Sequence, residues 1–396
     1  MKAKKLINQL MKQYYDDANM AKARGEKIGW ISGNFPQEIV ATMDLCVIYP
    51  ENHSAMLAMQ GKDVCCCEVA EAAGFSSDIC SFAKVNIGYC LNESIVDDKI
   101  PMPDYLLCCS NVCNQTLKWY QFLERKYQIP FVLIDIPYNV EYDVEDDKLQ
   151  YIKGQFREAI DRLQEITGHS FDEKKFEKVL RISNENGHLW RSISKLLSES
   201  HTMLRGMELF NYMGLIVTQR GRVTTTEALQ ALYNELVEKD NGNKDAGIQK
   251  WERRIFYDGM CCWPELMKLT ISFERYGMNV TGAINVDMWG LEYSSFDEMI
   301  CAYCNLPNAV NLERAKDMRL EKISEKKCDG MIVHMSRSCK MWSGIMYEML
   351  RQIEQEKEIP VLTFDGEQAD QRGFSESQFD TRLQGFHELL LENKKE

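Results

Sequence analysis

Residues 104–139, DYLLCCSNVCNQTLKWYQFLERKYQIPFVLIDIPYN, contain an apolar run, a cysteine, a helical pattern and a second apolar run. The same order returns at residues 329–366, where DGMIVHMSRSC leads into a helical pattern and then into IPVLTFDG. Each copy has Ser-x-x-Cys between its first apolar run and its helix, at Ser110/Cys113 and at Ser336/Cys339. Both segments therefore predict a strand–helix–strand unit of a parallel sheet.

The two segments also have similar lengths. From Cys113 to Pro130 the spacing is 17 residues, and from Cys339 to Pro360 it is 21 residues, a difference of about one helical turn. One interpretation is that two ordinary strand–helix–strand units agree by coincidence. The other, which we take as the working hypothesis, is that two similar domains present equivalent cysteines at equivalent loops.

Alternating strand and helix patterns extend on both sides of these segments, over residues 27–150 and 248–396. Residues 151–247 have helical periodicity and almost no strand pattern, and residues 1–26 predict an amphipathic helix that packs on the body. We expect an α/β fold: two Rossmann-like or flavodoxin-like parallel-sheet domains with a helical segment between them. More locally, DVCCCEVA at 63–70 fits a strand or a helix, and KDNGNKDAG at 239–247 predicts an exposed turn.

Composition narrows the classes of function. The net charge of −13 argues against nucleic acid as the main partner, because phosphate binding needs a basic face.

No window approaches 18 uninterrupted apolar residues, and the N-terminal segment does not resemble a signal peptide, so we expect a cytoplasmic protein without membrane contact. In that compartment the 15 cysteines are expected as metal ligands, nucleophiles or small core residues rather than disulfides. So many thiols also suggest an anaerobic setting.

A third cysteine resembles those of the repeat. Cys80 lies two residues after Asp78, which we predict to be the N-cap of a helix. Helix N-termini favour thiolates, and ligand sites of parallel sheets lie beyond the carboxyl ends of the strands. A cleft between the domains can thus bring Cys80, Cys113 and Cys339 together. Three converging thiolates suit a zinc ion with water as fourth ligand, or an iron–sulfur cubane with one iron free of protein sulfur, and their spacing matches neither a zinc ribbon nor a ferredoxin motif.

Polar residues at two other strand ends are candidates for catalysis. Glu51 and His53 follow an apolar strand in YPENHSAM, where an acid and an imidazole can act as general acid and base. The alternative is a solvated loop. Ser32 lies in SGNFPQE, between a strand and a helix that begins near Pro36, where backbone N–H groups can face an anion or a carbonyl.

The remaining cysteine pairs predict weaker candidates. Cys301 and Cys304 form one CxxC motif without a second, in an apolar context that is typical of a packed helix end. Cys261 and Cys262 follow a predicted strand and are candidates for a supporting position beside the cleft.

Taken together, these motifs resemble the 2-hydroxyacyl-CoA dehydratase family, which is related to the cluster-bearing subunits of benzoyl-CoA reductase. The resemblance covers about residues 27–390, and the YPEN stretch is more similar to the α subunit of a heterodimeric dehydratase than to the β subunit. The matching segments, in order, are GWISGNFPQEIV, YPENHSAM, DICSFAKVNIGY, CSNVCNQTLKWY, IPFVLIDIPYN, DGMIVHMSRSCKMWS and IPVLTFDGEQADQRGFSESQFDTRLQGF.

This resemblance implies a cofactor and partners. The positions that match the family's ligand motifs are Cys80, Cys113 and Cys339, which would hold a [4Fe–4S] cluster with a non-protein ligand on the fourth iron. A homologous β subunit would carry a second cluster, and an ATP-dependent iron–sulfur activator would deliver one electron. The electron converts the thioester carbonyl of a 2-hydroxyacyl-CoA into a ketyl radical anion, from which the hydroxyl group leaves.

The resemblance also implies roles for the candidate polar residues. Glu51 matches the acidic residue of YPEN and is expected to handle the departing hydroxide. Ser32 stands near the position of a hydroxyl residue that assists in some relatives, but out of register with it, and His53 is a neighbour of Glu51. Two other functions stay open: a subunit of an aryl-CoA reductase of the benzoyl-CoA reductase type, and a non-catalytic subunit for electron transfer or scaffolding.

Overall fold

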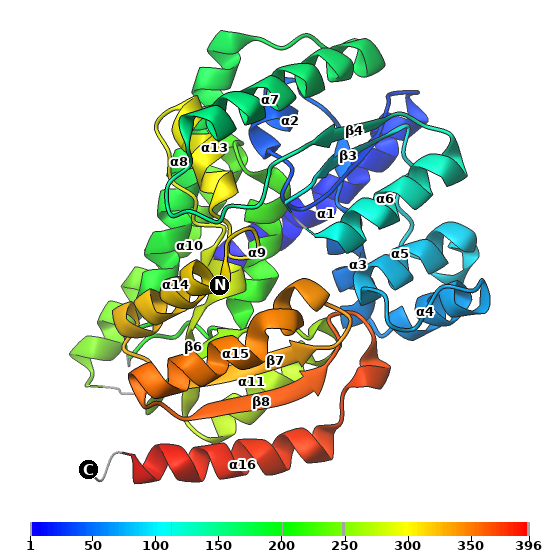
Figure 1. The fold of residues 1–396 in the computed structure, drawn as a ribbon. Helices are drawn as coiled ribbons and strands as arrows, with labels where there is room; N and C mark the ends of the chain where they lie inside the picture. The colour runs from blue at the N-terminus through cyan, green and yellow to red at the C-terminus, as the bar shows by residue number, and fades with distance from the viewer. Residues whose placement is uncertain (1, 112, 200, 248–249, 394–396) are drawn as a thin grey trace.

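The computed structural model describes residues 2–111, 113–199, 201–247 and 250–393. Two four-stranded parallel sheets have the same spatial order of strands, β2-β1-β3-β4 and β6-β5-β7-β8 (Figure 1). In both, the order reverses between the first and third strands, as in flavodoxin-like domains. The predicted α/β fold class with two such sheets is confirmed.

The strands are β1 (Gly29–Ile31), β2 (Val47–Ile48), β3 (Tyr105–Cys109), β4 (Phe131–Ile134), β5 (Arg253–Asp258), β6 (Met278–Ala283), β7 (Gly330–Ser336) and β8 (Val361–Gly366). The helices before residue 140 are α1 (Lys2–Ala23), α2 (Gln37–Thr42), α3 (Pro50–Met59), α4 (Asp63–Ala72), α5 (Ser81–Leu91), η1 (Glu93–Ile95) and α6 (Asn114–Tyr127). The later ones are α7 (Asp146–Thr167), α8 (Glu173–Leu196), α9 (Glu208–Gln219), α10 (Val223–Asp245), η2 (Trp263–Glu265), α11 (Leu266–Arg275), α12 (Ile284–Asp287), α13 (Phe296–Cys304), α14 (Leu312–Glu325), α15 (Lys340–Lys357), η3 (Gln371–Gly373) and α16 (Glu376–Glu392).

The two copies of the sequence repeat occupy equivalent places in the two sheets. β3–α6–β4 and β7–α15–β8 connect the third strand to the fourth in each. Both helices also end alike, with a left-handed residue directly before Ile-Pro: Gln128 at φ 54° and Glu358 at φ 53°. The hypothesis of two similar units, drawn from the Ser-x-x-Cys repeat, is confirmed at the level of topology.

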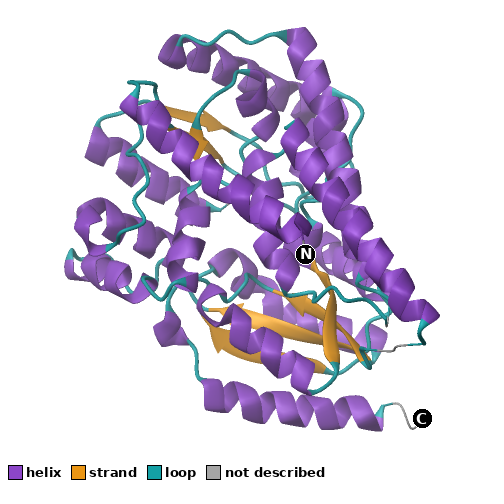
Figure 2. Ribbon diagram, turned by 180° about the vertical axis from the view of Figure 1, so that it is seen from behind, coloured by secondary structure: helices purple, strands orange, loops and turns teal. Residues whose placement is uncertain are grey.

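Long helices join and cover the sheets, which lie in separate halves of the molecule (Figure 2). The helical segment expected at 151–247 contains α8, α9, α10 and most of α7. One continuous apolar core includes Trp30 of β1, Trp190 of α8 and Tyr257 of β5. The two halves are therefore packed on shared helices, and α1 packs on this core through Ile7 and Ala18, as expected.

Two local predictions have clear outcomes. The run Cys65–Cys67 is helical, within α4, which was one of its two alternatives.

The exposed turn predicted at 239–247 is wrong, because α10 continues to Asp245 and only the residues after it turn. Long-range bonds stabilise this last part of α10: the Asp240 carboxylate accepts from the Thr202 hydroxyl and the Met203 N–H, both at 2.8 Å. Such tertiary contacts outweigh the low helix propensity of the segment.

Glycine at position 88 sets the distance between α4 and α5. A Cβ atom on Gly88 would stand 1.9 Å from the carbonyl oxygen of Cys66, so the two helix backbones touch here. Because α5 begins directly after Cys80, this contact also fixes where that cysteine lies.

We expect Gly88→Ala to lower the free energy of unfolding by about 3 kcal/mol, since backbone atoms must separate to admit the methyl group. Gly154→Ala is the matched control, because Gly154 is exposed on α7 with open space around its Cβ position. This control should stabilise the chain by about 0.5–1 kcal/mol. Urea unfolding followed by circular dichroism measures both changes, and equal midpoints for the two variants would contradict the argument.

Candidate functional site

Three cysteines from distant parts of the chain line one cavity of about 180 Å³. Each is the N-cap residue of a helix: Cys80 precedes α5, Cys113 precedes α6 and Cys339 precedes α15. Since α6 and α15 follow the equivalent strands β3 and β7, the cavity lies beyond the carboxyl ends of both sheets, where their strand orders reverse. The structure thus brings together all three predicted ligand positions.

The predicted N-cap Asp78 does not cap α5. Helix α5 begins at Ser81, and Cys80 itself occupies the capping position. Asp78 is exposed, and its backbone N–H donates to the Ser76 hydroxyl at 3.2 Å, so the preceding residues form a separate turn. This correction places the Cys80 sulfur closer to the free N–H groups of the helix than the sequence suggested.

Hydrogen-bond donors surround the sulfur atoms. The Thr116 N–H donates to Cys113 Sγ at 3.3 Å, and Gln368 Nε2 donates to Cys80 Sγ at 3.1 Å. Burial nevertheless raises the pKa of Cys80 to about 12 and raises the pKa of Cys339 above its ordinary value, with neighbouring cysteines adding to both shifts. These two thiols therefore keep their protons near neutral pH unless a positively charged group displaces them.

Hydrogen bonds across the two halves connect the cysteine loops. The Ser81 N–H donates to Ser338 Oγ at 3.1 Å, and the Ala369 N–H donates to Ser81 Oγ at 3.1 Å. Behind them, the buried Lys84 ammonium lies 2.9 Å from Asp370 Oδ2. Cys80 is thus fixed beside the loops that follow β7 and β8.

Glu51 lines the same cavity from the first turn of α3. Its Oε1 accepts a hydrogen bond from the Gly33 N–H at 3.3 Å, while its buried Oε2 has no partner among the described residues. Burial raises the pKa of Glu51 to about 7, even though backbone N–H groups, that of Gly33 among them, lower it. The carboxyl group can therefore exchange a proton at neutral pH, and it does not belong to a solvated loop.

Ser32 and His53 are not among the residues that line this cavity in the described chain. Ser32 is buried, and its hydroxyl accepts the Cys109 N–H at 3.3 Å. His53 is a buried residue of α3; its Nε2 lies 2.9 Å from the Asp98 carbonyl oxygen, and burial lowers its pKa to about 4. The Ser32 and His53 side chains therefore contact the backbone of the protein interior, at Cys109 and Asp98, rather than Glu51.

The sequence indicated only part of the apolar walls: it placed Cys261 and Cys262 beside the cleft, and their neighbours Met260 and Trp263 line the cavity. The wall residues come from seven different helices or loops, so no single local pattern indicates them all; Trp342 lies only three residues after Cys339. Among the described lining residues, Glu51 is the only charged one. The larger apolar side chains on the wall are Phe82, Trp119, Met213, Val217, Met260, Trp263, Met288, Trp289, Met341 and Trp342.

Other cysteines lie away from the cavity. Cys301 and Cys304 end the packed helix α13, as predicted. Cys261 and Cys262 are buried and do not line the cavity, although their neighbours Met260 and Trp263 do. Within the described ranges, no three His, Cys, Asp or Glu side chains are grouped as ligands of a single metal ion.

Comparison with known proteins identifies the family of this chain. A family model described as "2-hydroxyglutaryl-CoA dehydratase, D-component" matches residues 33–390. The "(R)-phenyllactyl-CoA dehydratase alpha subunit" of Clostridium sporogenes is 42% identical over 99% of this chain and 97% of its own length. The "(R)-2-hydroxyisocaproyl-CoA dehydratase alpha subunit" of Clostridioides difficile is 41% identical over the same shares.

The chain belongs to the 2-hydroxyacyl-CoA dehydratase family. Members with these names are hydro-lyases, and a more distant relative, at 24% identity over 95% of this chain and 91% of its own length, is a benzoyl-CoA reductase polypeptide of Thauera aromatica. The matched range spans the positions of all three cavity cysteines and Glu51. It begins after α1, which thus lies outside the matched segment of this dehydratase-family chain. No described helix of the chain is long and apolar enough to cross a membrane.

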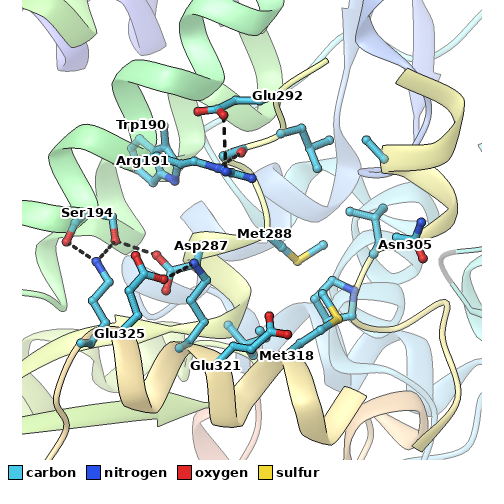
Figure 3. Close-up of a pocket in the computed structure, with 18 of the residues that line it drawn as sticks. Trp190, Arg191, Ser194, Asp287, Met288, Glu292, Asn305, Met318, Glu321 and Glu325 are labelled. Atoms are coloured by element: carbon cyan, nitrogen blue, oxygen red, sulfur yellow. Dashed lines mark hydrogen bonds and ion pairs between the residues drawn. The ribbon is translucent and has the colours of Figure 1, made fainter. Parts of the chain in front are cut away.

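A second cleft, of about 460 Å³, lies between α8, α12 and α14 (Figure 3). It is charged, but its cations are largely paired: Arg191 with Glu292, Lys322 with Glu325, and the buried Lys326 ammonium with the Ser194 carbonyl oxygen at 2.7 Å. Only Met288 lines both this cleft and the cysteine cavity among the described residues. The long side chain of Met288 therefore stands between the two spaces.

The buried carboxyl group of Glu51 predicts a dependence of stability on pH. Between its ordinary pKa of 4.5 and its folded value of about 7, the native protein keeps a proton that the unfolded chain loses. Below pH 4.5 Glu51 is protonated in both states and does not lower the free energy of unfolding. As the pH rises through 7 the buried carboxyl group must ionise, and the free energy of unfolding falls. We expect Glu51→Gln to exceed the original chain in stability by about 2–3 kcal/mol at pH 8 and to match it near pH 4.

Thermal unfolding of the metal-free chain at the two pH values measures this difference. Glu158→Gln, at an exposed position on α7, is the control and should show no change between them. A destabilised Glu51→Gln at pH 8 would mean that the carboxylate has a stabilising partner there.

Proposed function

We propose that this chain is the α subunit of an enzyme that removes water from an (R)-2-hydroxyacyl-CoA to form a 2-enoyl-CoA. The observation that carries the proposal is a single apolar cavity lined by three cysteines at helix N-termini and by Glu51, in a chain of this family. A polypeptide that only transfers electrons needs no such space beside its cysteines. The cavity therefore favours a catalytic role over a scaffold.

The proposed cofactor is a [4Fe–4S] cluster held by Cys80, Cys113 and Cys339. Each thiolate of a cubane binds a different iron, so its ligands stand farther apart than those of one zinc ion, in agreement with the ungrouped thiols of the described chain. No fourth cysteine is among the described residues of the cavity, which leaves one iron without a protein sulfur. When bound, the cluster supplies a Lewis-acidic iron beside the hydroxyl group of the substrate.

The residues of the chain then have defined tasks. The apolar walls exclude water from a substrate that carries an unpaired electron. Protonated Glu51 donates its proton to the hydroxide that leaves the α-carbon, so that water departs and Glu51 remains as a carboxylate. Ser32, through its bond to the Cys109 N–H, and His53, on α3, are proposed to hold the Gly33 and Glu51 segments in place.

The electron balance of the proposed reaction is closed. One electron from the ATP-dependent iron–sulfur activator, passed through a β subunit with its own cluster, turns the thioester carbonyl into a ketyl radical anion. The α-carbon–oxygen bond breaks as hydroxide leaves, and loss of a β-proton, which restores the proton that Glu51 gave up, gives the ketyl radical anion of the product. This radical returns the electron for the next turnover, so the net change is loss of water. The curated relatives carry the name α subunit, which supports the expected β partner.

The lining of the cavity also bears on the acyl group. Glu51 is the only charged side chain among the described lining residues, so a carboxylate on the acyl chain would meet no cation there. Four tryptophans and four methionines offer an apolar surface instead. We propose an uncharged aromatic or branched acyl group, in line with the phenyllactyl and 2-hydroxyisocaproyl groups in the names of two relatives.

An anaerobic assay with the chain, its β partner and the activator tests the reaction. We expect dehydration of (R)-phenyllactyl-CoA or (R)-2-hydroxyisocaproyl-CoA without net reduction, and a value of kcat/KM at least about 100-fold lower for 2-hydroxyglutaryl-CoA, because its carboxylate is buried unpaired. Consumption of reductant in proportion to product would instead identify an aryl-CoA reductase.

Iron and sulfide analysis tests the cofactor. We expect Cys113→Ser to lose the cluster while its circular dichroism spectrum stays that of the folded chain, since Cys113 is a half-buried N-cap rather than a core residue. Cys301→Ser, at a half-buried position on α13 away from the cavity, should keep the full complement of iron and sulfide. Zinc in place of iron, or equal iron in both variants, would contradict the cluster proposal.

A further inference from the structure

The loop after β8 brings one amide side chain to the cysteine cavity. Gln368 lies two residues after the end of β8, lines the cavity and is only 1% exposed. Its Nε2 group donates to Cys80 Sγ at 3.1 Å, and Cys80 belongs to the other half of the molecule. Within the described chain, no other side-chain N–H group donates to a sulfur atom of the three cavity cysteines.

The orientation of this amide is fixed at its other end. The Ser336 hydroxyl donates to Gln368 Oε1, and Ser338 Oγ lies 3.4 Å from the same oxygen. A flipped amide would turn its carbonyl oxygen toward Cys80 Sγ, where a thiolate has no proton to donate. The N–H group of Gln368 therefore faces the sulfur whenever Cys80 is ionised.

The backbone on both sides of this amide is anchored as well. The carbonyl oxygen of Gln368 accepts from the Trp263 N–H at 3.4 Å. The next residue, Ala369, donates its N–H to Ser81 Oγ at 3.1 Å, and Ser81 directly follows Cys80. The side chain of Gln368 is thus held at a fixed position relative to Cys80.

The bond from Gln368 suits a thiolate better than a thiol. The sulfur of a neutral thiol is a weak acceptor, so a buried amide donor gains little from protonated Cys80. A thiolate accepts a charge-assisted hydrogen bond, which is stronger, and burial strengthens it further. Cysteine binds metals as the thiolate. The geometry of Gln368 therefore matches the metal-bound form of Cys80.

We propose that Gln368 is a positioning residue whose N–H···S bond to Cys80 raises the reduction potential of the iron–sulfur cluster. The bond draws electron density from the sulfur, so the extra negative charge of the reduced state is better tolerated. This inference rests on the proposed function, because it needs a [4Fe–4S] cluster on Cys80, Cys113 and Cys339.

A redox titration with dithionite, followed by electron paramagnetic resonance on the anaerobic complex with the β partner, tests this role. Gln368→Leu fills a similar space without the donor. We expect the equilibrium constant for one-electron reduction of this chain's cluster to fall about tenfold, which is a midpoint about 59 mV lower. Gln371→Leu is the matched control, because the Gln371 amide donates to Glu265 at 3.2 Å and does not line the cavity. Its midpoint should be that of the original chain.

Ser336→Ala separates the electronic role from a structural one. This variant removes the hydroxyl that holds Gln368 Oε1 but leaves the N–H group, which the charged sulfur still orients. We expect its midpoint to stay close to that of the original complex. If Gln368 only fixed the loop after β8, Ser336→Ala would shift the midpoint as much as Gln368→Leu does.

Isotope labelling detects the bond directly. Gln368 is the only glutamine among the described lining residues, so a chain with ¹⁵N in its glutamine side chains carries one labelled amide at the cavity. Combined with an unlabelled β partner and reduced with dithionite, it should show a ¹⁵N coupling to its cluster in pulsed resonance spectra. This coupling also assigns the signal that belongs to this chain. It should persist in Gln371→Leu, and it needs no variant at Gln368, so it decides the question even if Gln368→Leu fails to retain iron.

The outcomes distinguish the two proposals. If the original complex holds no cluster on this chain, the proposed cofactor fails together with the role of Gln368. If the cluster is present but shows no ¹⁵N coupling, or if Gln368→Leu and Gln371→Leu have equal midpoints, the role of Gln368 is wrong while the proposed function stands. A shift in Ser336→Ala as large as that in Gln368→Leu would also overturn it.

Discussion

The site depends on the hydrogen bonds that join Ser81 to the loops of the opposite half, at Ser338 and Ala369. All three residues are buried, so an unmade bond would leave a polar group without water or partner. The bonds start one residue after Cys80, and Ser338 directly precedes Cys339. They therefore fix the separation of two cysteines that belong to different halves. The shared apolar core holds the two halves together, and these hydrogen bonds fix how the loops of one half lie against those of the other at the cavity.

The cavity offers hydrogen-bond donors to its sulfur atoms, but its burial disfavours the ionised forms of the thiols and of the Glu51 carboxyl group. Helix N-termini and Gln368 offer N–H groups to sulfur, yet burial raises the pKa of Cys80 and Cys339 and keeps both thiols protonated when they are alone. Burial acts on the pKa of Glu51 in the same direction. An electron-poor metal cluster would supply the positive charge that the protein itself does not place there, and ionisation of the thiols would follow its binding. Without such a cluster, Cys80 and Cys339 are uncharged and the cavity is largely apolar.

The parts of this architecture that follow from local pattern were predictable from the sequence. The strand–helix–strand repeat located Cys113 and Cys339, and the same reasoning found the setting of Cys80 although the capping residue was wrong. Contacts between distant segments were not predictable: the end of α10 is stabilised through Asp240, and the cavity walls come together only in the folded chain. His53 shows the limit most clearly, because its place after a strand indicated catalysis while its ring points away to the Asp98 carbonyl.

The two similar halves have diverged where their strand order reverses. The loop after β1 is short and polar, and it places Gly33 and Asn34 on the cavity with an N–H group aimed at Glu51. The equivalent loop after β5 contains Gly259, at φ 93°, and leads to the apolar side chains of Met260 and Trp263. The first half thus supplies Glu51, the charged residue of the described lining, and the second half adds apolar wall to that of Phe82 and Trp119, while each contributes a cysteine from the loop after its third strand. Because either half alone presents only part of the chemistry, the duplication is useful only when both are joined around one cavity.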